Sequence, residues 1–133
     1  MNEPTQAIAV RVGSRRFAVP LEQVAEVIDT PELHPVPARA AELAGVVAVR
    51  SALHPVVDLG IRFDGTAAAG DRLLIVRAAP GAEAVALRVD DVEGIVRGGV
   101  SGRRARTAEP VRGVLRVAGG EPIPLLDLGR LLG

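Results

Sequence analysis

The chain contains an internal repeat, and this repeat constrains its fold more than any other feature of the sequence. Three stretches of the first half match stretches of the second half in the same order: residues 17–28 with 85–96, 45–49 with 113–117, and 55–60 with 124–129. The offsets are 68, 68 and 69 residues. We infer two halves of about 65 residues each, related by duplication and divided at the small, polar stretch 64–71.

Each half is expected to consist of short β-strands. Residues 7–12 alternate so that Ile8, Val10 and Val12 share one face of a strand. Residues 45–50 and 53–57 predict a hairpin that turns at Ser51 and Ala52. Short strands with frequent turns are typical of a barrel or a sandwich. Because a unit of about 65 residues is only marginally stable alone, the two units should share an interface.

The motif PxxDLG occurs in both halves and places Asp58 and Asp127 at equivalent positions. Asp is a favoured N-cap, and each of the two precedes a short apolar stretch that predicts a helical turn. A catalytic aspartate is seldom duplicated in this way. We therefore interpret both residues as structural caps.

The composition excludes several classes of function. The 133 residues include 16 basic and 16 acidic ones, and this balance argues against nucleic acid or an anionic membrane as the main partner. Two Phe and no Trp or Tyr leave little surface on which bases could stack. Without Cys there is no disulfide and no zinc–thiolate site, and without Lys there is no Schiff-base nucleophile.

The sequence carries no sign of a targeting or membrane-spanning segment. The N-terminal residues 1–6 are polar, and no apolar run approaches the roughly 18 residues that cross a bilayer. We expect a soluble, cytoplasmic protein that does not insert into a membrane.

Three groups of residues could carry chemistry, and each has a simpler interpretation. Ser51, His54 and Asp58 are triad residue types, but Ser51 and His54 would point to opposite faces of a strand. His34 and His54 lack the local spacing of metal ligands. The stretch 98–106 could cradle a phosphate, yet it lacks the usual glycine spacing and reads as a solvated loop. We predict no catalytic residue, no metal and no cofactor.

Two charged residues break the symmetry of the repeat. Glu26 lies in an otherwise apolar strand, and Arg50 ends a valine-rich one. The second half has Gly94 and Ala118 at the equivalent positions. Our hypothesis is that Glu26 and Arg50 pair across neighbouring strands and orient a functional surface that only the first half carries. Two unrelated surface charges are the alternative, and an exposed pair contributes at most about 1 kcal/mol to stability.

Two ordered motifs point to a family. The first consists of Phe17, Val19, Val24, Glu26 and Val27, and the second runs from Gly45 through Arg50 to PVVDL at residues 55–59. Together with their spacing, these motifs resemble the CheW-like family over nearly the whole chain, from Ala7 to Leu132. The family pattern has Asn where Ala48 stands and Gly where Ser51 stands.

The resemblance implies an all-β fold of two tandem, five-stranded SH3-like barrels that pack around a shared core, with short helical turns. Residues 1–133 would form a single CheW-like domain. Its sub-barrels would span about 7–66 and 70–132, with terminal strands that can exchange between them.

The resemblance also implies a function. CheW-like proteins are non-enzymatic adaptors of two-component signal transduction in bacterial chemotaxis. They join the regulatory domain of a CheA-type histidine kinase to the cytoplasmic tip of chemoreceptors, and so are recruited to membrane-associated receptor arrays. On this pattern the groove between the barrels takes the receptor's helical hairpin, and an exposed surface of the first-half barrel meets the kinase.

Site residues follow from the resemblance by position. The candidates for the first-half interaction surface are Val24, Glu26, Gly45 and Arg50. The candidates for the second-barrel side of the receptor groove are Val89 and Val92. Two alternatives stay open: a diverged CheW-like module with another signalling or localisation partner, and a β-barrel that binds a small molecule or a nucleic acid.

Overall fold

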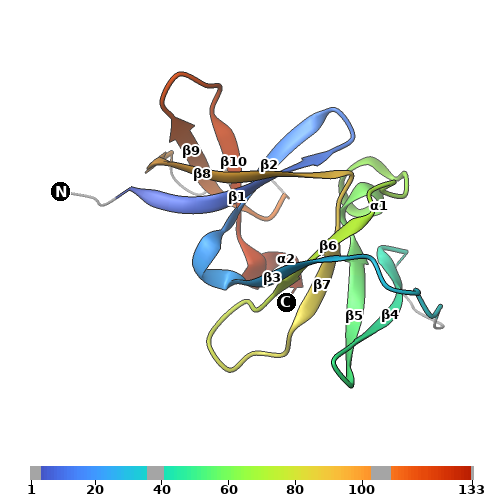
Figure 1. Ribbon diagram of the computed structural model, residues 1–133. Helices are drawn as coiled ribbons and strands as arrows, with labels where there is room; N and C mark the ends of the chain where they lie inside the picture. The colour runs from blue at the N-terminus through green and yellow to red at the C-terminus, as the bar shows by residue number, and fades with distance from the viewer. Residues whose placement is uncertain (1–3, 36–40, 103–108, 133) are drawn as a thin grey trace.

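The computed structural model describes residues 4–35, 41–102 and 109–132. Its strands form two five-stranded sheets, which confirms the all-β prediction (Figure 1). One sheet is a closed barrel of β1 (Thr5–Val12), β2 (Arg15–Pro20), β10 (Ile123–Leu126), β9 (Val111–Val117) and β8 (Asp91–Ser101), in this order. The other has the order β3 (Val24–Asp29), β6 (Arg72–Val76), β7 (Val85–Arg88), β5 (Ala52–Asp58) and β4 (Leu43–Val49). We call it the open barrel, because β3 and β4 are its two edges.

Each barrel takes strands from both halves of the sequence. The first half supplies β1 and β2 to the closed barrel, and the second half supplies β6 and β7 to the open one. The ranges 7–66 and 70–132 therefore do not each form one barrel. The chain crosses between the barrels after β2, through the short 3-10 helix η1 (Leu21–Gln23), and again between β7 and β8.

The exchange is itself symmetric under the repeat. In the closed barrel β2 pairs in parallel with β10, with Ala18 opposite Leu125. In the open barrel β7 pairs in parallel with β5, with Ala86 opposite Val56. Ala18 and Ala86 are equivalent in the repeat, and so are Val56 and Leu125. Both halves thus pair their strands in the same pattern. The first two strands of each half complete the barrel that the other three strands of the other half begin.

Three apolar clusters hold this arrangement together. One fills the closed barrel and includes Ala9, Leu115 and Leu125. Another fills the open barrel and includes Val47 and Leu73. The largest lies between the barrels and consists of Ile8, Val10, Val12, Phe17, Val19, Val57, Leu59, Leu74, Val76, Leu87, Val89, Val111, Leu126 and Leu128. Strands of both barrels thus supply the shared core that the resemblance implied.

Two short helices cap the shared core. Both α1 (Leu59–Asp64) and α2 (Leu128–Leu132) bury their first residue in it. Asp58 accepts a hydrogen bond from the Ile61 N–H at 3.2 Å, and Asp127 accepts one from the Arg130 N–H at 3.1 Å. Both N-cap predictions are confirmed. Among the described residues, no helix is long and apolar enough to cross a membrane.

Candidate partner-binding surface

The hairpin of β4 and β5 ends in a tight turn that presents Arg50. Val49 pairs with Ala52, so the loop consists of Arg50 and Ser51 alone. Both have positive φ angles, 47° and 69°. Two left-handed residues in a two-residue loop are the pattern of a type I′ turn, whose twist matches that of the flanking strands.

The predicted Glu26–Arg50 ion pair is present. Arg50 Nη1 lies 2.5 Å from Glu26 Oε2, and Nη2 lies 2.8 Å from Oε1. The Arg50 side chain is 74% exposed, whereas that of Glu26 is 27% exposed. The hydrogen bonds from Arg50 lower the pKa of Glu26, and the same contact raises the pKa of Arg50. The two charges are thus joined through both carboxylate oxygens, and the guanidinium still faces solvent.

The pair spans the seam between the two edges of the open barrel. Glu26 lies on β3 and Arg50 adjoins β4, and these strands are not hydrogen-bonded to each other as a ladder. The backbone of the described residues closes the seam at one bridge, where His34 and Val46 exchange N–H to O hydrogen bonds of 2.9 Å. The predicted pair thus connects β3 and β4, the two edge strands of the sheet. These edges lie next to each other because the sheet curls round on itself.

The closed barrel shows why only the first half needs this pair. There the equivalent strands form a ladder, with Gly98 opposite Val117 and Gly99 opposite Arg116. The residue equivalent to Gly99 in the first half is Pro31, which has no N–H to donate. The ladder cannot continue there, and the side chains of Glu26 and Arg50 join the two edges instead. In the closed barrel, Gly94 and Ala118 occupy their places.

The outer face of the β4–β5 hairpin is apolar. Val46 pairs with Pro55 and Ala48 with Leu53, while Val47 and Val56 point into the barrel. Side chains of opposite residues share a face, so these four lie together on the outside. Leu53 is 68% exposed. Sequence reasoning did not single out this face, because residues 46–49 are apolar throughout and show no alternation that would separate an outer from an inner face.

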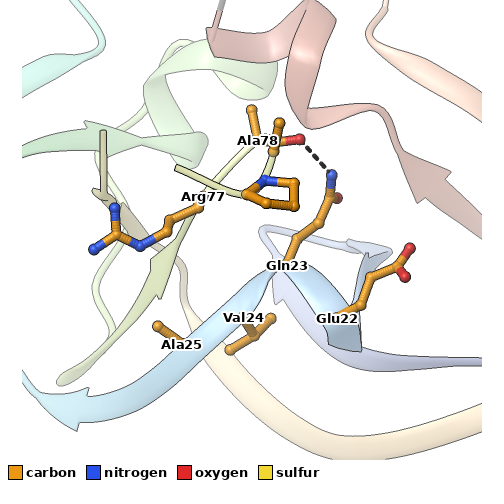
Figure 2. Close-up of a pocket in the computed structure, with 8 residues that line it drawn as sticks. Glu22, Gln23, Val24, Ala25, Arg77 and Ala78 are labelled. Atoms are coloured by element: carbon orange, nitrogen blue, oxygen red, sulfur yellow. Dashed lines mark hydrogen bonds between the residues drawn. The ribbon is translucent and has the colours of Figure 1, made fainter. Parts of the chain in front are cut away.

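Val24 lies at the other end of the site, beside a cavity of about 480 Å³. The cavity is lined by Glu22, Gln23, Val24, Ala25, Arg77, Ala78, Ala79 and Pro80 (Figure 2). Gln23 Nε2 donates to the Ala78 carbonyl at 2.8 Å and so fixes one wall. Val24 is half-buried and also packs against the shared core. Val24 therefore lies between the cavity and the shared core.

Gly45 has a structural reason to be glycine. Its φ is 144°, and a Cβ built there would lie 2.5 Å from the His34 carbonyl oxygen. The residue lets the segment after β3 approach β4 closely enough for the His34–Val46 bridge. Gly45 thus contributes to the surface through its backbone and not through a side chain. A β-bulge lies between Leu43 and Gly45.

The two second-half candidates separate. Val92 is half-buried on β8 and packs against the edge of the shared core. Val89 is 1% exposed and lies inside that core, so its side chain cannot contact a partner. The exchange of strands explains the difference, because the crossing from β7 to β8 carries Val89 between the two barrels. Ile95, 64% exposed on β8, is an apolar residue that sequence reasoning missed.

Ser51 and Asp58 do not come together in a catalytic site. Asp58 is 1% exposed, and its Oδ1 accepts hydrogen bonds from the Ile61 and Ala68 N–H groups. Ser51 lies in the turn at the far end of the same strand, about 20 Å away by strand rise. In the described part of the chain no group of three or more His, Cys, Asp or Glu could hold a metal. Of the stretch 98–106, residues up to Ser101 continue β8, and 103–106 lie outside the described residues.

Comparisons with known proteins agree with the fold. The family model of the CheW-like domain matches residues 6–133. The crystal structure of the scaffolding protein TtCheW from Thermoanaerobacter tengcongensis superposes with a TM-score of 0.79 at 20% sequence identity, covering 92% of this chain and 88% of that one. A search of curated proteins found no match.

Proposed function

The chain belongs to the CheW-like family, and from this premise we propose that it couples a CheA-type histidine kinase to the cytoplasmic tip of chemoreceptors. Proteins of this family are non-enzymatic scaffolds, and membership of the family supports a CheW-type adaptor role for this chain. The protein would act in the cytoplasm, recruited to membrane-associated receptor arrays.

The observation that carries the proposal is the surface of the open barrel at the turn between β4 and β5. A preorganised, exposed Arg50 lies beside the apolar outer face of the β4–β5 hairpin. Arginine donates in a fixed fork and suits a half-buried pair, and apolar side chains around it exclude water on contact. We assign this surface, with Glu26 and Arg50 at its edge, to the kinase.

The receptor would bind elsewhere, along the groove between the barrels. Val24 and Val92 pack against the shared core, and Ile95 adds an exposed apolar side chain on β8. Such a surface accepts the apolar face of an amphipathic helix. The cavity beside Val24 extends it by room for one side chain or more. An adaptor with two separate surfaces can bind kinase and receptor at once.

The first experiment is a titration of the purified protein with the regulatory domain of its own organism's CheA-type kinase, followed by a receptor-tip fragment. Saturable binding of the kinase domain, with formation of a three-part complex on addition of the receptor fragment, is the expected result. A folded protein that binds neither would overturn the coupling function. Binding to a different signalling protein would then favour the diverged CheW-like module, for which Ala48 in place of the usual Asn is the motivating feature.

The Arg50→Ala variant tests which surface meets the kinase. We expect kinase affinity to fall by about ten-fold or more, since one well-placed charged contact is worth that much. The melting temperature should stay close to that of the parent. Arg16→Ala is the matched control, because Arg16 also pairs with a glutamate, Glu93, but on the closed barrel. Equal loss in both variants, or unfolding of Arg50→Ala, would remove Arg50 from the interface.

A further inference from the structure

The closed barrel carries a second charged surface that the adaptor function does not use. It lies on the outer face of β8 and β9 and consists of Arg97, Gly99, Ser101 and Arg116. Val96 and Leu115 point into the barrel, so Arg97 and Arg116, which follow them, point outward. Both arginines are exposed. Gly99 lies opposite Arg116 and Ser101 opposite Val114, which joins the two strands into one surface.

These two arginines lack carboxylate partners among the described residues. Arg15, Arg16, Arg50 and Arg72 each lie within 4 Å of an Asp or Glu oxygen, whereas Arg97 and Arg116, like Arg11, Arg77 and Arg112, have no such contact among the described residues. In a chain with equal numbers of acidic and basic residues, two neighbouring arginines without an acid concentrate positive charge locally. Arg97 and Arg116 are diagonal neighbours across the ladder, close enough to act on one ligand.

Arg116 is held in a fixed orientation by a neutral group. Its Nε donates to Ser101 Oγ at 2.6 Å. Within the part of the chain that the structure describes, neither terminal Nη group makes a further hydrogen bond, and these two groups together can donate to one carboxylate. Gly99 adds no side chain beside them, and a Cβ built there meets nothing within 4 Å. Among the described residues, no atom therefore stands within 4 Å of the position a side chain at Gly99 would take.

We propose that this face of β8 and β9 binds an acidic segment of a partner protein, whose carboxylates accept hydrogen bonds from Arg97 and Arg116. The zero net charge of the chain favours a protein over a nucleic acid, because no net positive charge of the molecule adds to the attraction of two arginines for a phosphate polymer. The equivalent positions of the open barrel carry Asp29 and Ala48, so the surface belongs to the closed barrel alone. The proposal does not depend on the coupling function.

The test is an NMR titration of the ¹⁵N-labelled full chain with a ten-residue peptide of alternating Glu and Ser, at low salt. We expect amide shifts at residues 97–101 and 114–117, which weaken as salt is added. In the double variant Arg97→Gln/Arg116→Gln, affinity should fall at least ten-fold. Arg16→Gln is the control, because it removes the same charge from the same barrel at a guanidinium already bound by Glu93.

A second variant keeps both arginines. Gly99→Asp places a carboxylate directly opposite Arg116 without a steric clash, so it should occupy that guanidinium within the chain and weaken peptide binding several-fold. Peptide shifts centred on Glu26 and Arg50, or affinity unchanged in the double variant, would overturn the proposal. Tighter binding of a ten-nucleotide single strand to the same amides would overturn it as well, by assigning the surface to phosphate.

Discussion

The turn that presents Arg50 is built from two residues in a conformation that glycine adopts most easily. Arg50 and Ser51 have φ angles of 47° and 69°. For residues with a Cβ, this left-handed conformation costs about 1 kcal/mol or more each. At Arg50 the ion pair to Glu26 holds the conformation in place. At Ser51, where the family pattern has glycine, no side-chain hydrogen bond among the described residues does so.

Replacing Ser51 by glycine should therefore stabilise the protein. We expect the free energy of unfolding of Ser51→Gly to rise by about 1 kcal/mol, less the small entropic cost of a glycine in the unfolded chain. Urea denaturation of both proteins measures the difference. Ser14→Gly is the matched control: Ser14 is an exposed turn residue without a positive φ, so there the substitution should destabilise slightly. A stabilising Ser14→Gly would contradict this explanation.

At the scale of elements, the two aspartates of the repeat accept different sets of hydrogen bonds. Asp127 bonds the Arg130 N–H at the start of α2. Asp58 caps α1 and in addition accepts the Ala68 N–H at 3.0 and 3.2 Å. It thereby fixes the stretch that leads from α1 into β6. The motif predicted both caps, but the second bond of Asp58 joins residues ten positions apart and carries no local signal.

The alanine variants should differ accordingly. Asp127→Ala loses an ordinary cap, which costs about 1 kcal/mol. Asp58→Ala also leaves the buried Ala68 N–H unsatisfied, which adds about 1–3 kcal/mol. Chemical denaturation of the two variants under one set of conditions compares them. Equal losses of stability would mean that the Asp58–Ala68 contact contributes nothing.

Across the whole molecule, the exchange of strands makes the two halves interdependent. Each barrel contains β-strands of both halves, and the largest apolar cluster lies between the barrels. We expect fragments 1–66 and 67–133 to be unfolded when separate, because neither holds a complete sheet. Mixed in equal amounts, they should form a one-to-one complex with the β-rich circular dichroism of the intact chain. Cooperative thermal unfolding of either isolated fragment would contradict this expectation.

Carboxylates that accept hydrogen bonds from distant segments should make the free energy of unfolding depend on pH. Asp90 accepts hydrogen bonds from the Gly13 and Ala69 N–H groups, which lower its pKa below the ordinary 3.8. Two hydrogen bonds from Arg15 likewise lower the pKa of Glu109 below 4.5. Because the unfolded chain then takes up protons first, the stabilisation is complete above about pH 5 and is lost as the pH falls through the lowered values.

Thermal melts between pH 3 and pH 7 measure this dependence. The melting temperature should be nearly constant at the upper end and fall steadily below about pH 4.5. The double variant Asp90→Asn/Glu109→Gln should start lower and lose less with acid. A parallel decline in both proteins would assign the acid sensitivity to other groups.

Much of this molecule follows from local patterns. The repeat, the alternation and the two aspartate caps predicted strands, turns and helix starts, because each depends on residues close together in the chain. The broken symmetry of the repeat singled out Glu26 and Arg50, whose contact the structure contains. Only the tertiary structure decided which barrel each strand joins. The parallel pairs β2–β10 and β5–β7 connect segments far apart in the sequence, and backbone pairing has no residue code that specifies its partner. That long-range choice buried Val89 and placed Pro31 at the seam, where the missing N–H leaves an ion pair to join the edges of the barrel.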